Sequence, residues 1–205
     1  MKNKNKPTQQ KIFPAQIEKG IYIDFEGFKD KSPSILGLLY DNQFEQIVLD
    51  ADLEEAARHR GLLRMNLESA IRRVLEIAGG KRRKIFAFSE HERKVVLRHT
   101  NFQRSFSRRY RNVRIIAKSW INRNNPENRP EDWGLKSIMK YVGPQIPSPL
   151  EEHSPTYRLR EVKAMLLKRK AYASLTKVKK NHWESLLAYN EWDCRALPKL
   201  LRKTL

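Results

Sequence analysis

The stretch Ile-Tyr-Ile-Asp-Phe-Glu-Gly-Phe, residues 21–28, predicts a buried β-strand that carries two carboxylates. Side chains alternate between the two faces of a strand, so Asp24 and Glu26 share one face and lie roughly 7 Å apart along it. Two acids in an otherwise apolar strand are unfavourable to bury unless a positive group compensates them. A divalent cation would compensate them, whereas an edge strand with its polar face in water needs no cation. This stretch alone leaves both interpretations open.

The segments that follow predict further strands. Residues 34–40 and 43–49 are two largely apolar runs joined by a tight turn, and they extend the first strand into a three-stranded antiparallel meander. Residues 85–88 and 112–117 predict a fourth and a fifth strand. Because helical segments separate these last strands, the chain is expected to form an α/β fold, with a mixed sheet of antiparallel and then parallel strands flanked by helices.

Apolar residues at helical spacing place the helices between and after the strands. The expected helices cover residues 52–60 and 67–78, the segment after Ser89, and residues 134–143, 156–171 and 180–203. Asp52 and Asn66 are the expected N-caps of the first two.

Composition limits the class of protein. The 205 residues suggest one domain over residues 12–205, preceded by a basic flexible tail at residues 1–11. With 42 Lys and Arg against 23 Asp and Glu, the net charge of +19 favours a nucleic-acid partner first and an anionic membrane surface second. A single cysteine fits a reducing, cytoplasmic compartment. No apolar run approaches the length of a membrane span, so no transmembrane helix is expected. A membrane is not among the expected partners.

A second acidic motif lies near the C-terminus, where Tyr189 and Asp193 are four residues apart and share a helix face. Combined with Asp24-Phe25-Glu26, this motif resembles the DEDD superfamily of 3′–5′ exonucleases, in the subgroup with a tyrosine in the third motif. The amino-acid sequence of four segments is similar to that of a bacterial branch of predicted ribonuclease H-like nucleases. These segments are residues 21–26, 86–92, 134–138 and 187–197.

The resemblance implies a ribonuclease H-like fold and a metal-dependent nuclease, expected to be a 3′–5′ exonuclease on single-stranded DNA or RNA. It implies two Mg²⁺ or Mn²⁺ ions, with Asp24 and Asp193 as ligands and Glu26 binding one ion and orienting the attacking water. Tyr189 would hold this water through its hydroxyl, because a phenol with a pKa near 10 is a poor base at neutral pH.

The second motif departs from the family pattern. The exonucleases usually place an aspartate on the helix after the fourth strand, and the residue at that place here is Glu92, with Glu90 as the alternative. A glutamate could reach a metal ion through water. Ser89-x-x-Glu92 is also a capping box, in which the glutamate binds helix N-terminal amides instead.

Basic residues gather in two clusters. Residues 93–125 hold ten Lys or Arg and no acid, and residues 157–180 hold nine against Glu161 alone. Since solvated helix faces normally mix both signs, both clusters are predicted to contact phosphates. The predicted nucleic-acid-binding residues are Arg93, Lys94, Arg104, Arg108, Arg109, Arg111, Lys168, Arg169 and Lys170. Phe102 and Phe106, interleaved with the first cluster, are expected to be core residues on a helix.

Two other functions remain open at this point. One is a ribonuclease H-like module that binds nucleic acid without cleaving it, which Glu92 in place of an aspartate would suit. The other is an endonuclease on the same fold. The sequence does not distinguish DNA from RNA.

Overall fold

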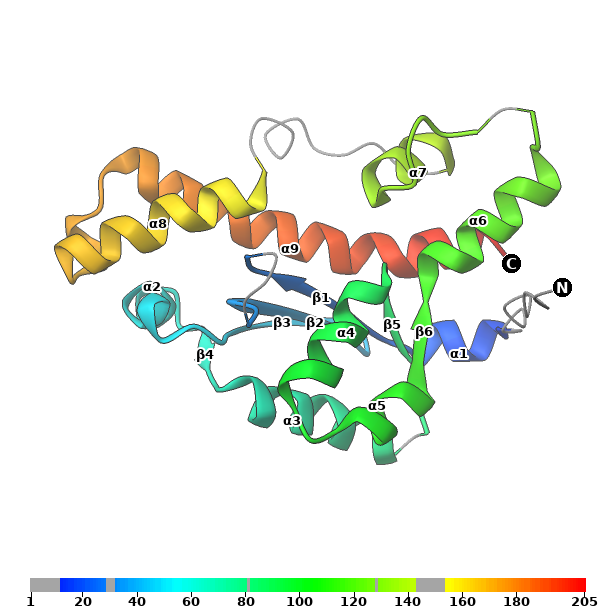
Figure 1. Ribbon diagram of the computed structural model, residues 1–205, viewed down its shortest axis with the longest axis horizontal. Coiled ribbons are helices and arrows are strands. Elements are labelled where there is room, and N and C mark those ends of the chain that lie inside the picture. Colours follow the sequence, from blue (N-terminus) through cyan, green and yellow to red (C-terminus); the bar gives the residue numbers. More distant parts are fainter. Residues whose placement is uncertain (1–11, 29–31, 81, 128, 143–153) are drawn as a thin grey trace, which may run out of the picture.

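The computed structural model describes residues 12–28, 32–80, 82–127, 129–142 and 154–205, and the predicted tail at residues 1–11 lies outside them (Figure 1). Its strands are β1 (Ile21–Glu26), β2 (Ile35–Tyr40), β3 (Gln43–Val48), β4 (Leu63–Arg64), β5 (Ile85–Ala87) and β6 (Tyr110–Asn112). They form one six-stranded sheet in the order β4-β3-β2-β1-β5-β6. β1, β2 and β3 are antiparallel, while β4, β5 and β6 run parallel to β3, β1 and β5. The predicted fold class is confirmed, and the arrangement is consistent with a ribonuclease H-like fold.

Helices cover both faces of this sheet (Figure 1). The α-helices are α1 (Pro14–Glu18), α2 (Glu54–His59), α3 (Leu67–Gly80), α4 (Glu90–His99), α5 (Gln103–Arg109), α6 (Val113–Asn124), α7 (Leu135–Val142), α8 (Pro155–Arg169) and α9 (Lys177–Lys203), with the short 3-10 helices η1 (Ala51–Leu53) and η3 (Tyr172–Ser174). Among the residues that the structure describes, no helix combines the length and apolarity that a membrane crossing needs.

Alternation along β1 divides the sheet into two faces. Ile21, Ile23 and Phe25 point to the face that we call the α3 face, where they join a core cluster with α3, α4 and α5. Asp24 and Glu26 point to the opposite face, which we call the α9 face because α9 crosses it. Two separate core clusters form on the α9 face, one with α6 and α7 and one with η1, α2 and α8, and α9 contributes to both.

Two details of the sequence prediction are wrong. The fifth strand is not residues 112–117 but β6, and helix α6 begins at Val113. The physical reason is Asn112, whose Oδ1 accepts a hydrogen bond from Ile115 N at 3.1 Å and caps the helix. Asp52 is likewise not the N-cap of the next helical segment: Asp50 caps the 3-10 helix η1 that precedes α2 by accepting from Asp52 N at 3.1 Å.

Other local predictions are confirmed. Asn66 caps α3 by accepting from Ser69 N at 2.8 Å. Ser89 and Glu92 form the capping box of α4. Phe106 is fully buried and Phe102 packs against the same cluster, so both are core residues.

Asn112→Ala should lower the free energy of unfolding by about 1 kcal/mol, because α6 would lose its N-terminal acceptor. Asn112→Asp keeps an acceptor oxygen and should stay close to wild type. Urea denaturation followed by circular dichroism measures both. Equal stability of the alanine and aspartate variants would show that the cap does not stabilise α6.

Candidate metal centre

Three carboxylates from two distant parts of the chain meet on the α9 face. β1 supplies Asp24 and Glu26, and α9 supplies Asp193. One ligand oxygen from each lies within 4.8 Å of those of the other two, which is close enough for one cation to contact all three. The predicted convergence of Asp24, Glu26 and Asp193 is therefore present in the structure.

Burial makes these carboxylates hard to ionise together. Glu26 and Asp193 are only 8% and 9% exposed. Burial raises the pKa of Asp24 to about 6, although a hydrogen bond from Asn190 acts in the opposite direction. Burial, followed by the charges of Asp24 and Asp193, raises the pKa of Glu26 well above its usual value. Burial and the Asp24 charge do the same to the pKa of Asp193.

The protein's own cations compensate this cluster only in part. Arg158 on α8, 2% exposed, lowers the pKa of Glu26, and Lys136 on α7 lowers the pKa of Asp193. Both carboxylates nevertheless keep raised pKa values. Within the described part of the chain, the buried Asp193 Oδ1 accepts no hydrogen bond. Three close carboxylates with a spare buried oxygen fit a hard divalent cation such as Mg²⁺ or Mn²⁺.

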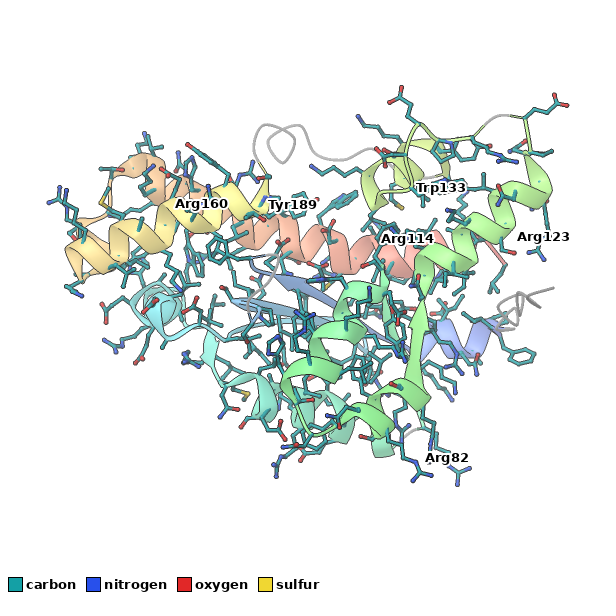
Figure 2. The ribbon with its side chains drawn as sticks, viewed as in Figure 1. Arg82, Arg114, Arg123, Trp133, Arg160 and Tyr189 are labelled. Atoms are coloured by element: carbon teal, nitrogen blue, oxygen red, sulfur yellow. The ribbon has the colours of Figure 1, made fainter. Side chains whose placement is uncertain are left out.

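Tyr189 lies one helical turn before Asp193, on α9 beside the start of α8 (Figure 2). Burial, followed by the charges of Asp193, Glu26 and Asp24, raises its pKa, so the phenol stays protonated at neutral pH. Lys136 Nζ lies 4.7 Å from the centre of its ring. A protonated hydroxyl close to three carboxylates can donate a hydrogen bond, and it does not act as a general base.

A hydrogen-bonded relay orients Asp24. The fully buried Asn190 donates its Nδ2 hydrogens to Asp24 Oδ2 at 2.8 Å and to Asp24 O at 3.3 Å. Gln46 on β3 in turn donates to Asn190 Oδ1 at 3.1 Å and to Leu187 O at 3.0 Å. Gly37 on β2 makes room for the amide, since a Cβ there would lie 2.5 Å from Asn190 Oδ1.

The sequence prediction did not include this relay, although each of its residues is unusual for its position in the sequence. Asn190 directly follows Tyr189, Gln46 is a polar residue within a strand, and Gly37 interrupts an apolar run. Arg158 and Lys136 were also missed as cations next to the carboxylates. None of these features identifies a partner, because the contacts join segments that are far apart in the chain.

Glu92 lies near the cluster but is used at the start of α4. Its Oε2 accepts from Ser89 N at 3.2 Å and from Ser89 Oγ at 3.1 Å. Burial and the Asp24 charge raise its pKa to about 8. Glu92 does not belong to the three-carboxylate group, and its role as a metal ligand stays a prediction. The alternative, Glu90, forms an ion pair with Arg93.

The predicted nucleic-acid-binding residues are spread over several elements. Arg93 and Lys94 lie on α4, Arg104, Arg108 and Arg109 on α5, Arg111 on β6, Lys168 and Arg169 on α8, and Lys170 caps its C-terminus. Three of them have structural partners. Arg93 pairs with Glu90, Arg109 donates to Ala78 O at 3.1 Å and Arg111 donates to Tyr110 O at 2.7 Å.

Comparison of the chain with protein-family models, with curated proteins and with solved structures finds no match. The site is therefore interpreted from its own geometry. That geometry is a buried carboxylate cluster with an adjacent phenol and an amide relay behind it.

The raised pKa values predict a pH dependence of the metal-free protein. Asp24 titrates near pH 6 when folded and near its ordinary value of 3.8 when unfolded, so between these values the folded state binds more protons. Its contribution to the free energy of unfolding is present at low pH and is lost as the pH rises to about 6. Asp24→Asn should therefore stabilise the protein at pH 8, by on the order of 2 kcal/mol.

Urea denaturation with a chelator at pH 5 and pH 8 measures this effect. The stability gained by Asp24→Asn should be smaller at pH 5 than at pH 8. An Asp24→Asn protein that is less stable than wild type at pH 8 would contradict a destabilising effect of the buried Asp24 charge.

The relay predicts that Asn190→Ala weakens Mn²⁺ binding by about 10- to 100-fold, because Asp24 loses the donor that orients it. Gly37→Ala should weaken binding in the same direction without touching a carboxylate, since its new methyl displaces Asn190. Gly79→Ala is the matched control, because a Cβ at Gly79 meets no atom within 4 Å. Calorimetric titration measures all three. Wild-type affinity in Gly37→Ala would show that the relay does not orient Asp24.

Proposed function

We propose that this chain is a metal-dependent nuclease with the mechanism of the DEDD 3′–5′ exonucleases, tyrosine subgroup. Its substrate would be single-stranded DNA or RNA, and the reaction would be phosphodiester hydrolysis. The observation that carries the proposal is the convergence of Asp24, Glu26 and Asp193 within 4.8 Å, with Tyr189 one turn away. These are the four residues that the family pattern assigns to catalysis.

The position of the cluster in the sheet supports the proposal. Asp24 and Glu26 lie in the C-terminal half of β1, and β5 runs parallel beside it. Glu92 follows the end of β5 on α4. Ligands of open α/β sheets bind outside the carboxyl ends of parallel strands, where loops and helix N-termini leave room for them.

Two Mg²⁺ or Mn²⁺ ions, when bound, would stabilise the attacking and the leaving oxygens of an in-line displacement. Asp24 on β1 and Asp193 on α9 would hold the ions. The hydrogen bond from Asn190 would keep the Asp24 side chain oriented. Glu26 would bind one ion and accept a hydrogen bond from the attacking water. Tyr189 would fix the position of that water by donating or accepting a hydrogen bond, while remaining protonated.

A nucleic-acid partner is supported by charge. The net charge of +19 attracts a polyanion over a long range, and several of the basic side chains that the sequence singled out are exposed to solvent. Lys94, Arg104, Arg108, Lys168, Arg169 and Lys170 are exposed.

One observation favours a second candidate, the binding module without catalysis. Glu92 Oε2 accepts both hydrogen bonds from Ser89, so this oxygen caps α4 and does not face the cluster as a free ligand. The three buried carboxylates with raised pKa values argue against this candidate. They destabilise the metal-free protein, and a module that only binds nucleic acid does not require them. An endonuclease on the same fold would share every residue of the site.

Asp193→Asn should abolish cleavage and weaken Mn²⁺ binding, because a ligand charge is lost. Tyr189→Phe keeps the ring and removes one oxygen, so cleavage should fall by roughly 100-fold with Mn²⁺ affinity retained. The measurement is cleavage of labelled single- and double-stranded DNA and RNA with Mn²⁺, with products resolved on gels. The product ladder distinguishes exonuclease from endonuclease.

A Tyr189→Phe protein that cleaves at the wild-type rate beside an inactive Asp193→Asn would remove the tyrosine-subgroup assignment. If wild type binds nucleic acid but cleaves none of the four substrates, the binding module is the better reading.

A further inference from the structure

Two basic surfaces lie on opposite faces of the sheet, a distinction that the sequence does not contain. The first, here the α5 surface, carries Arg104, Arg108 and Arg109. The second, here the α8 surface, consists of the exposed cations of α8, its C-cap and the start of α9, namely Arg160, Lys168, Arg169, Lys170 and Lys177.

Core packing assigns each surface to its face. Phe106 of α5 belongs to the cluster with Ile23, on the α3 face. Leu159 of α8 belongs to the cluster with Ile35. Ile35 is paired with Glu26 in the antiparallel register, so the two side chains share the α9 face. The α8 surface is therefore on the side of the carboxylates, and the sheet separates the α5 surface from them.

Helix α8 connects its basic end directly to the site. Near the start of α8, the charge of the buried Arg158 lowers the pKa of Glu26. The preceding residue, Tyr157, is 41% exposed. The ring of Tyr157 meets that of His182 edge-on, with 5.7 Å between centroids, at the first turns of α9. Lys168 lies ten residues after Arg158, roughly 15 Å further along the helix. Figure 2 shows Arg160 and Tyr189 together on this side of the molecule, and Arg82 at the far side.

The acids of this region are already paired. Glu161 binds Lys179, and Asp50 and Asp52 both bind Lys163 at 2.6 and 2.9 Å. Among the described residues, Lys168 and Arg169 have no ion-pair partner. An exposed aromatic ring followed by a row of uncompensated cations is the composition that binds single-stranded nucleic acid without sequence preference.

We propose that single-stranded nucleic acid reaches the carboxylates along the α8 surface, with a base against Tyr157 and phosphates on Lys168 and Arg169, and not over the α5 surface. This inference rests on the proposed nuclease function and specifies its substrate path.

The test compares three double charge reversals of equal size. Lys168→Glu/Arg169→Glu alters the α8 surface, Arg104→Glu/Arg108→Glu alters the α5 surface, and Lys19→Glu/Lys203→Glu is the control on exposed lysines outside both. Fluorescence anisotropy with labelled single-stranded DNA and RNA, in EDTA and over a series of KCl concentrations, gives the affinity and its salt dependence. Cleavage kinetics with Mn²⁺ give KM and kcat.

The α8 variant should bind at least about tenfold more weakly than the control, with a salt slope reduced by about two, because two phosphate contacts are lost. Its KM should rise while kcat is retained. Tyr157→Ala should also weaken binding, whereas Tyr157→Phe should retain it, because stacking needs only the ring.

Three results would overturn the path. They are a loss confined to the α5 variant, an equal loss in all three variants, and wild-type affinity in the α8 variant. In each case cleavage by wild type would leave the nuclease proposal intact. Wild-type protein that binds anionic phosphatidylserine vesicles but no oligonucleotide would overturn both the path and the proposed function.

Discussion

The burial of three carboxylates close to one another is the constraint that the rest of this structure accommodates. Burial raises the pKa of Asp24, Glu26 and Asp193, and the charge of Asp24 adds to the effect on the other two. All three carboxylates would therefore gain free energy by protonation. They stay together because two rigid elements hold them. β1 is a central strand bonded on both sides, and α9 is a helix of 27 residues that lies across it.

Hydrophobic burial on both sides of the cluster offsets the free-energy cost of burying these carboxylates. On one side, Trp183 and Leu186 of α9 pack with Ile35 and α8. On the other side, Leu197 and Leu200 pack with α6 and α7. Both groups are fully buried or nearly so, and each large side chain contributes about 1.5–3 kcal/mol when removed from water. The acids thus occupy the gap between two cores on the α9 face, and changes in either core can move α9 without touching a carboxylate.

The sequence predicted the features that depend on residues close together in the chain, such as which side chains share a face of one strand or helix. Alternation along residues 21–26 revealed the face of Asp24 and Glu26, and the spacing of Tyr189 and Asp193 revealed their shared helix face. It failed where two local readings compete, as at residues 112–117, whose apolar composition suits a strand but whose Asn112 caps a helix. It also failed for contacts across the sheet. The relay from Gln46 through Asn190 needs the register of three strands and α9, and the two basic clusters look alike until core packing assigns them to opposite faces.

Glu92 combines a local role in capping α4 with a place close to the carboxylate cluster. A capping box needs a side chain at the third helical position that reaches back to the amide of the cap residue, and glutamate and glutamine have that length. Glu92 makes this bond to Ser89 N, together with a bond from Ser89 Oγ. An aspartate is one methylene shorter than the glutamate or glutamine that a capping box uses at this position. The capping box therefore gives Glu92 a structural role in addition to the metal role that was predicted for it. Burial and the charge of Asp24 raise the pKa of Glu92, so the carboxyl group that caps α4 also interacts with the carboxylate cluster.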